Sequence, residues 1–380
     1  MKIGIFTDSY LPYVSGVVKS IEFFRQEYQK QGHEVYIFAP YYAKCPKEPR
    51  IFRYISVPSL ANPGYNLAIP FSMRVRPMLK NLNLDIIHVH SPFLLGRVGA
   101  KYARKYRIPL VVTFHTLYEE YVHYFPWKQK TTKELTRKIC RNFCNSCDLV
   151  ISPTAIVADY LVKLGVTTPI ESIPTGINLT SFQKPNPHWL HSTYQIDSDK
   201  KILIFVGRLG QEKNIPFLFN ILHKLLPAYP QLCLVVVGDG PEKEAFVEQI
   251  QQMGLTKQIN LTGKLPWERV VNCYQDSDIF VCSSLTETQG LVVVEAKAAG
   301  LPAVAVRSYG VGEMIADQED GFLTELDEDS FQQKIKLLLD DPQLYQQMSQ
   351  KARENSLKFS AEASAKKMLG CYQKLIKKSF

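Results

Sequence analysis

Two glutamates with seven residues between them are the first feature of this sequence that could do chemistry. They bracket the stretch Glu287–Glu295, in which Thr288, Gln289, Gly290 and Leu291 follow the first glutamate. Carboxylates accept hydrogen bonds from hydroxyl groups, and glycine lets a backbone approach a ligand closely. Unpaired N–H groups at a helix start suit anionic or hydroxyl-rich ligands. The pattern favours one glutamate on a sugar and the other on a ribose diol; acids that only stabilise a helix start are the competing interpretation.

A second loop carries two cations that suit a diphosphate. The loop Gly207–Lys213 follows a short apolar run, and Arg208 and Lys213 lie near its two ends. Their charge and fixed donors could clamp a diphosphate without a metal ion, so we predict no metal site. Such a clamp would stabilise a departing nucleoside diphosphate. Ordinary surface charge at a loop is the alternative interpretation.

Short apolar runs that alternate with helical periodicity must position these loops. The runs that look like buried parallel strands are Lys2–Thr7, Glu34–Ala39, Asp85–His90, Pro109–His115, Asp148–Thr154, Lys201–Gly207, Leu232–Gly238, Ile259–Thr262, Asp278–Ser283 and Pro302–Arg307. Helical segments such as Val17–Gln31 and Gly96–Tyr106 separate them, and residues 327–380 are expected to be mostly helical. This alternation predicts an α/β fold with parallel sheets, whose ligands lie at the carboxyl ends of the strands.

The alternation stops between Asn178 and Lys200. That stretch holds Pro185, Pro187 and several polar residues without a clear period, which is typical of a linker. A chain of 380 residues is also too long for one ordinary domain. We therefore predict two Rossmann-like, doubly wound domains with a cleft between them, residues 1–185 and 186–355, followed by a C-terminal helix over residues 356–380.

The composition indicates the cellular compartment in which the protein works. No run reaches the ~18 apolar residues of a spanning helix, and the N-terminus does not have the pattern of a signal peptide, so we expect a cytoplasmic protein. The eight cysteines fit a reducing compartment. Cys140, Cys144 and Cys147 have a spacing that could hold an iron–sulfur cluster, but they would share one helix face, and we favour packing in the core.

The net charge of +9 is unevenly distributed. Residues 1–170 hold 23 Lys and Arg against 11 Asp and Glu, or +12, and the remainder holds 22 against 25, or −3. A basic half beside a slightly acidic half indicates an anionic partner for the first half. Nucleic acid and an anionic membrane surface are the two candidates, and a merely solvated basic surface is the third interpretation.

The motifs together resemble glycosyltransferase family 4. The two loops, Gly238-Asp239-Gly240-Pro241 and Leu261-Thr262-Gly263 occur in the order seen in that family, and the resemblance covers essentially the whole chain. It implies a GT-B fold, a retaining glycosyl transfer, a nucleotide sugar bound by the C-terminal domain, and a last helix that crosses back to the first domain. No tightly bound cofactor is implied.

The resemblance also assigns roles to residues. Glu287 would bind hydroxyls of the transferred sugar and Glu295 the ribose, while Arg208 and Lys213 would bind the diphosphate. Residues Thr288, Gln289, Gly290 and Leu291 would line the sugar, and Gly263 and Lys264 would lie at the base. Gly16 and Gly207 are expected to approach the donor closely, and His115, at the end of a predicted strand, would contact the donor sugar near the reaction centre.

A narrower resemblance concerns the acceptor. The stretch His115–Tyr124, together with Thr286–Leu291, looks like the bacterial diacylglycerol glucosyltransferases. This resemblance implies transfer of glucose from UDP-glucose to the 3-hydroxyl of 1,2-diacylglycerol, at the inner face of the cell membrane and without nucleic acid. Family 4 transfer to another acceptor, such as phosphatidylinositol or a soluble sugar, stays open, as do a nucleotide-sugar 2-epimerase and a non-catalytic sugar-nucleotide-binding protein.

Two basic segments could supply the membrane contact. Arg74, Arg76 and Lys80 alternate with apolar residues, and a run of basic residues follows the aromatic Phe125-Pro126-Trp127. The cations of that second run are Lys128, Lys130, Lys133, Arg137, Lys138 and Arg141. Basic residues beside aromatic ones are typical of an interfacial helix, and anionic headgroups attract each Lys or Arg by roughly 1 kcal/mol. Core packing of the apolar side chains is the alternative.

Overall fold

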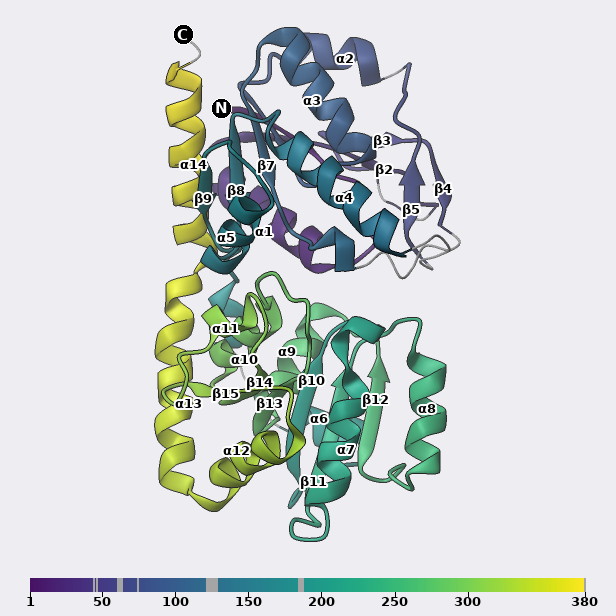
Figure 1. Ribbon diagram of the computed structural model, residues 1–380, viewed down its shortest axis with the longest axis vertical. Coiled ribbons are helices and arrows are strands. Elements are labelled where there is room, and N and C mark those ends of the chain that lie inside the picture. The colour runs from purple at the N-terminus through teal and green to yellow at the C-terminus, as the bar shows by residue number, and fades with distance from the viewer. Residues whose placement is uncertain are drawn as a thin grey trace. The chain divides into compact units, whose positions relative to one another are not determined.

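The computed structural model describes residues 1–43, 45, 47–59, 64–73, 75–120, 129–183 and 188–378. The chain forms two compact units (Figure 1). The first contains Met1–Gly176 and Ala361–Phe380, and the second contains Ile177–Ser360. Among the features discussed above, Arg74, residues 121–128, Pro185 and Pro187 lie outside the described residues.

The first unit is built on a seven-stranded parallel sheet with the order β3-β2-β1-β6-β7-β8-β9. Its strands are β1 (Lys2–Phe6), β2 (Glu34–Pro40), β3 (Ile51–Tyr54), β6 (Ile86–Val89), β7 (Leu110–Thr113), β8 (Leu149–Ser152) and β9 (Ile170–Ser172). The five central strands lie where the apolar runs predicted them. The edge strands β3 and β9 are short and partly exposed, so they lack the apolar signal of buried strands.

Helices cover both faces of this sheet because its side chains alternate in direction. Phe6 and Phe38 face a core formed with α3 (Leu94–Tyr106) and α4 (Gln129–Cys144). Ile5 and Ile37 face the opposite core, formed with α1 (Gly16–Lys30) and α14 (Ala361–Lys378). The last helix of the chain therefore completes the first unit, beside α1 (Figure 1). The remaining elements of this unit are β4 (Ser56–Pro58), β5 (Asn66–Ala68), α2 (Val75–Asn81) and α5 (Ala155–Lys163).

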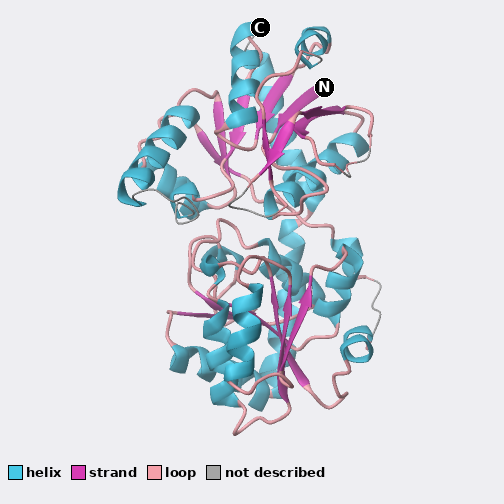
Figure 2. Ribbon diagram, turned by 90° about the vertical axis from the view of Figure 1, so that its right-hand side faces the viewer, coloured by secondary structure: helices cyan, strands magenta, loops and turns pink. Residues whose placement is uncertain are grey.

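The second unit is built on a six-stranded parallel sheet with the order β12-β11-β10-β13-β14-β15. Its strands are β10 (Lys201–Val206), β11 (Leu232–Val237), β12 (Ile259–Gly263), β13 (Ile279–Cys282), β14 (Ala303–Val306) and β15 (Gly321–Thr324). Its helices are α6 (Trp189–Tyr194), α7 (Ile215–Leu225), α8 (Lys243–Gln252), α9 (Trp267–Gln275), α10 (Leu291–Ala299), α11 (Val311–Met314), α12 (Glu328–Asp340) and α13 (Pro342–Ser356). The helices flank the strands in this unit as in the first (Figure 2), which confirms the prediction of doubly wound α/β architecture.

The prediction of a linker between Asn178 and Lys200 was wrong in part. Within that stretch Leu179–Phe182 forms a 3-10 helix, and α6 packs on α9. The carboxylate of Asp276 accepts hydrogen bonds from the backbone N–H groups of His188 (2.9 Å) and Leu190 (2.7 Å). A contact across more than 80 residues holds this short helix, and local periodicity does not report such contacts.

The three clustered thiols are core residues, as expected. Cys140, Cys144 and Cys147 are buried in the same apolar cluster as Phe143. Burial raises the pKa of all three thiols, that of Cys144 to about 12. Among the described residues, no helix combines the length and apolar character needed to cross a bilayer.

Glycine permits a close approach of two backbone segments beside β10 and β11. Gly238 has a φ of 143°, and a Cβ there would stand 1.8 Å from the carbonyl oxygen of Gly207. A Cβ at Gly240 would stand 2.3 Å from the carbonyl oxygen of Leu209. The loops after these two strands thus pack backbone against backbone, which explains the glycines of the Gly238–Pro241 motif.

We predict that Gly238→Ala lowers the free energy of unfolding of the second unit by roughly 2–4 kcal/mol, because the methyl group meets backbone that cannot move aside. Gly312→Ala is the matched control, since a Cβ at that helical position meets only Arg307 Cγ at 3.8 Å. Thermal unfolding of both variants checks the prediction. Equal stability of the two variants would contradict the close approach.

Candidate functional site

The candidate residues of the second unit lie at the carboxyl edge of its sheet. The loop Gly207–Lys213 follows β10, and Glu287 lies in the loop after β13. These two strands are neighbours at the point where the strand order reverses, because β11 and β12 extend the sheet on one side and β14 and β15 on the other. Ligands of doubly wound sheets bind at this point.

An ion pair joins the two loops. The ammonium group of Lys213 donates a hydrogen bond to Glu287 Oε1, and the Lys213 side chain is 11% exposed. The Leu285 N–H donates to the Glu212 carbonyl at 3.2 Å, and the Ser283 hydroxyl donates to the Lys213 carbonyl at 2.9 Å. The structure therefore brings together a cation assigned to the diphosphate and a carboxylate assigned to the sugar.

Arg208, half-buried, lies at the start of the same loop. The backbone beneath it is fixed by the Gly207 N–H, which donates to the Val237 carbonyl at 2.9 Å, and by the Leu209 N–H, which donates to the Asp239 carbonyl at 3.1 Å. Its guanidinium group thus projects from a loop that has little freedom to move. A planar guanidinium group with several N–H donors on a rigid loop suits a phosphate ligand.

The Glu287 loop ends at Gly290, which precedes α10 and has a φ of 81°. A third loop supports it: the Gly310 N–H donates to the Glu287 carbonyl at 2.8 Å, and a Cβ at Gly310 would stand 2.2 Å from the Thr288 carbonyl oxygen. Sequence reasoning missed Gly310. Its position after the predicted strand Pro302–Arg307 was the available signal.

The second glutamate lies inside the protein. Glu295, on α10, has no exposed surface, and Tyr274 donates a hydrogen bond to its Oε2 at 3.0 Å. Of the residues around α10, Gln289 is buried, while Thr288 and Leu291 are partly exposed. A ribose could reach the Glu295 carboxylate only after neighbouring side chains move.

Gly263 and Lys264 lie further along the edge, at the end of β12. Gly263 has a φ of 72° and its carbonyl accepts from the Gly238 N–H at 3.1 Å, while Lys264 is exposed. The edge therefore carries, in order, the Lys264 end, the Gly238 turn, the Arg208 loop and the Glu287 loop. This line of loops can bind an extended ligand.

A buried ion pair holds α10 in place. Lys297 Nζ lies 2.5 Å from Asp320 Oδ2, and it also donates to the Met314 carbonyl at 2.7 Å. Asp320 in turn accepts from the Ala316 N–H at 2.9 Å. Because both charges are paired and buried, this contact fixes α10 against the segment that carries α11.

The first unit also gathers polar residues at its carboxyl edge. Asp8 follows β1, His90 follows β6, and His115 follows β7. Asp8 accepts from the Leu95 N–H at 2.7 Å and from the Ser91 hydroxyl, so it holds the start of α3; burial raises the pKa of its carboxyl group. Gly16 is the first residue of α1, is exposed, and has open space where a Cβ would be.

His115 is partly exposed and lies beside a second histidine, His90, which is buried. His90 Nδ1 lies 2.8 Å from His115 Nε2, and the two rings stack with their centroids 5.0 Å apart. Burial lowers the pKa of His115 to about 3, so its imidazole is neutral at pH 7. Sequence reasoning named His115 but gave no role to His90, although both end predicted strands.

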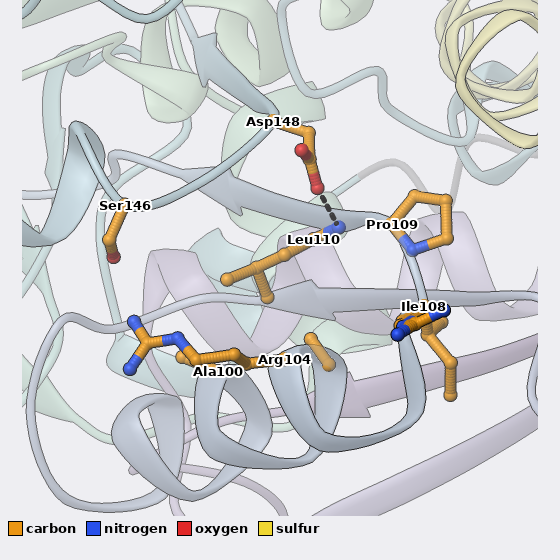
Figure 3. A pocket seen from close by; sticks show the side chains of 9 residues that line it. Ala100, Arg104, Ile108, Pro109, Leu110, Ser146 and Asp148 are labelled. Carbon is orange, nitrogen blue, oxygen red and sulfur yellow. Dashed lines mark hydrogen bonds between the residues drawn. The ribbon is translucent and has the colours of Figure 1, made fainter. Parts of the chain in front are cut away.

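A hollow in the first unit lies away from these residues. Its volume is about 300 Å³, and it lies between the end of α3 and the starts of β7 and β8 (Figure 3). The Asp148 carboxylate at its wall accepts from the Leu110 N–H at 2.7 Å. Because the hollow lies at the amino ends of these strands, it is separate from the edge that carries His115.

Comparisons with known proteins identify the family. Residues 14–181 match the model described as "Glycosyltransferase Family 4", and residues 190–355 match "Glycosyl transferases group 1". The chain is 31% identical to the alpha-monoglucosyldiacylglycerol synthase of Acholeplasma laidlawii, covering 100% of this chain and 98% of that one. It is 34% identical to the enzyme of the same name from Streptococcus pneumoniae, covering 85% and 75%.

A solved structure supports the fold. HepE of Anabaena, in a crystal structure with UDP-glucose, aligns with a TM-score of 0.79 and 17% identity over 98% of this chain and 100% of that one. The two family models and the two relatives show that the chain belongs to glycosyltransferase family 4. It has the GT-B fold and is a glycosyltransferase that depends on a nucleotide sugar.

The ion pair gives a prediction for the unliganded protein. Lys213→Met and Glu287→Gln should each destabilise the second unit, and the double variant should lose roughly 1–3 kcal/mol less than the sum, because either single change already removes the same ion pair. A double-mutant cycle of chemical denaturation measures this coupling. Additive effects would show that the two side chains do not interact in solution.

Proposed function

We propose that this protein transfers glucose from UDP-glucose to the 3-hydroxyl of 1,2-diacylglycerol, with retention of configuration, to give an α-monoglucosyl diacylglycerol. The observation that carries the proposal is the ion pair of Glu287 with Lys213 at the strand reversal, because a carboxylate suits the hydroxyls of a sugar and an ammonium group suits a diphosphate. The similarity to two alpha-monoglucosyldiacylglycerol synthases, over 100% and 85% of this chain, supports the choice of sugar and acceptor.

The donor lies along the loops at the carboxyl edge of the second sheet. Arg208 and Lys213 bind the diphosphate, and Glu287 accepts hydrogen bonds from hydroxyls of the glucose. Glu295 serves the ribose once its surroundings open, and the uracil lies near Gly263 and Lys264. Backbone N–H groups from Thr288 to Leu291, at the start of α10, line the sugar and complement negative charge.

The reaction is a front-face substitution. The diacylglycerol oxygen forms a bond to the anomeric carbon as the bond from that carbon to the β-phosphate oxygen breaks, and a phosphate oxygen accepts the hydroxyl proton. Arg208 and Lys213 stabilise the charge that develops on UDP. Because these cations supply the charge, the clamp needs no divalent metal. Gly16 and His115 of the first unit act at the donor sugar and the acceptor hydroxyl.

The acceptor is a lipid, and an apolar segment of the first unit supports membrane contact. Among the described residues from Ile55 to Met78, which include the hairpin of β4 and β5 and the start of α2, seven large apolar side chains are exposed, namely Ile55, Val57, Leu67, Ile69, Phe71, Met73 and Met78. Such clustering along one stretch is unusual for a surface that faces only water. In α2 itself, Val75 and Leu79 are buried, so only some of the apolar residues of this segment pack in the core.

The charge of the first unit also supports contact with a membrane. The unit that contains Met1–Gly176 and Ala361–Phe380 holds 28 Lys and Arg against 13 Asp and Glu, or +15, and the other holds 17 against 23, or −6. A groove of about 630 Å³ between α3 and α4 is lined by Arg97, Lys101, Arg104 and Lys138. This basic unit suits the anionic inner face of a cell membrane.

Two of the predicted membrane-facing cations also form ion pairs within the first unit. Lys133 Nζ lies 3.1 Å from Glu120 Oε2, and Arg137 Nε lies 3.5 Å from Glu119 Oε1. These ion pairs link α4 to the segment after His115. The Lys133 side chain is 37% exposed and that of Arg137 is 47% exposed, so their contact with lipid headgroups stays a prediction.

A product assay tests the proposed function. The purified protein is incubated with a panel of nucleotide sugars and diacylglycerol in mixed micelles, with EDTA present, and the linkage of the product is read by NMR. We expect α-glucosyl diacylglycerol from UDP-glucose, and loss of turnover by at least about tenfold in Arg208→Gln. Transfer only to phosphatidylinositol or a soluble sugar, or only from another nucleotide sugar, would overturn the assignment.

A vesicle assay tests the membrane contact. We expect binding to vesicles that contain an anionic phospholipid and weaker binding at raised salt. The double variant Phe71→Ser/Met73→Ser should bind at least about tenfold more weakly, because apolar area no longer leaves water. Leu337→Ser/Leu357→Ser, which changes exposed apolar residues of the second unit, is the control. Binding that is unaffected by salt and by the first pair of substitutions would refute this contact.

A further inference from the structure

Three histidines of the first unit lie ring beside ring. His88 and His90 are buried, and His115 is partly exposed. His88 and His90 come from the end of β6, and His115 follows the neighbouring strand β7. The ring centroids of His88 and His90 are 4.3 Å apart, and those of His90 and His115 are 5.0 Å apart. The ring of His90 therefore contacts both other rings, and its orientation is restricted.

His88 is held from both sides. Its Nε2 lies 2.7 Å from the Thr113 hydroxyl, and its Nδ1 lies 2.5 Å from the hydroxyl of Tyr372 on α14. Tyr372 itself lies 3.3 Å from the Tyr28 hydroxyl. Burial lowers the pKa of His88 to about 3 and lowers that of His90 as well, so all three rings are neutral at pH 7.

A neutral histidine carries one ring proton, and the pair His90–His115 has two ways to place its protons. If His90 Nδ1–H donates to His115 Nε2, then His115 carries its own proton on Nδ1. If His115 Nε2–H donates instead, then His90 must carry its proton on Nε2. The hydrogen bond of 2.8 Å excludes a proton on both facing nitrogens.

The surroundings of His90 favour the first arrangement. Its Nε2 atom is buried and has no hydrogen-bond partner among the described residues. A proton on Nε2 would be a buried donor without an acceptor, which costs free energy. A bare lone pair at that position is tolerated better, because the C–H groups that make up most of a protein interior are weak donors.

We propose that His90 is a positioning residue that holds His115 in the tautomer with its proton on Nδ1. His90 Nδ1–H donates to His115 Nε2, and the neighbouring His88 ring restricts the orientation of the His90 ring. The two facing nitrogens are then satisfied, and His115 has one defined donor.

This inference deepens the proposed function and rests on it for its consequence. A neutral His115 with Nδ1–H offers a hydrogen bond to an oxygen of the donor sugar that acts as an acceptor. The opposite tautomer would require a hydroxyl proton there. His90 thus determines whether His115 donates a hydrogen bond to the sugar or accepts one from it. His90 does not contact the sugar itself.

The position of the proton is measured directly by ¹⁵N NMR of the protein labelled at its eight histidines, with His115→Gln used to assign the His115 signals. We expect a protonated Nδ1 and an unprotonated Nε2 for His115 in the wild type. A proton on Nε2 would overturn the proposal. This readout is independent of activity, so it distinguishes failure of the inference from failure of the proposed function.

Two isosteric variants connect the proton to turnover. In His90→Asn the amide can present an N–H near the former Nδ1, and we expect the His115 tautomer to persist and kcat to fall less than about threefold. In His90→Asp a carboxylate demands a donor, so the proton should move to His115 Nε2 or be added there, and kcat should fall about tenfold or more. The reverse order of the two variants would contradict a positioning role.

Tyr372→Phe is the matched control. It removes a hydroxyl from the same buried cluster and leaves the His90–His115 hydrogen bond intact. The His115 proton should stay on Nδ1, although stability falls. A shift of the proton in this variant would show that the cluster as a whole, and not His90, fixes the tautomer.

Discussion

The ion pair between Lys213 and Glu287 is the contact on which the candidate donor site depends. It joins the loops that follow β10 and β13, the two strands between which the order of the sheet reverses. Both side chains are largely buried and would be costly to leave unpaired. Close backbone packing of Gly238 on Gly207 and of Gly310 on Thr288 then fixes the same loops from either side. The backbone of these loops is thus fixed where we propose that the diphosphate and the sugar bind.

Much of this fold is predictable from sequence, because buried parallel strands are short apolar runs whatever surrounds them. The two motifs at the carboxyl edge are predictable for a related reason, since their spacing follows from the strands that precede them. Features that depend on residues distant in sequence are not predictable in this way. The short helix α6 is held by Asp276, and Gly310 is required because its backbone lies against Thr288. The burial of Glu295 against Tyr274 also has no local signal. The ion pairs of Lys133 and Arg137 also have no local signal, because their acidic partners come from another segment.

The first unit combines two properties that the proposed transfer to a lipid requires. Its surface is basic and carries an exposed apolar segment before α2, whereas its interior orders a set of neutral histidines at the carboxyl edge of the sheet. The last helix takes part in this interior through Tyr372, although it is separated from the other strands and helices of the unit by the whole second unit in sequence. Substitutions near the C-terminus can therefore alter the surroundings of His90 and His115.

The account's central claim is that the carboxyl edge of the second sheet binds the nucleotide of the donor. A crystal structure of the protein with UDP tests it most directly. The account predicts the diphosphate against Arg208 and Lys213, with the uracil near Gly263 and the ribose at a rearranged Glu295. A nucleotide bound to the first unit, or bound at the second without contact to either cation, would contradict it.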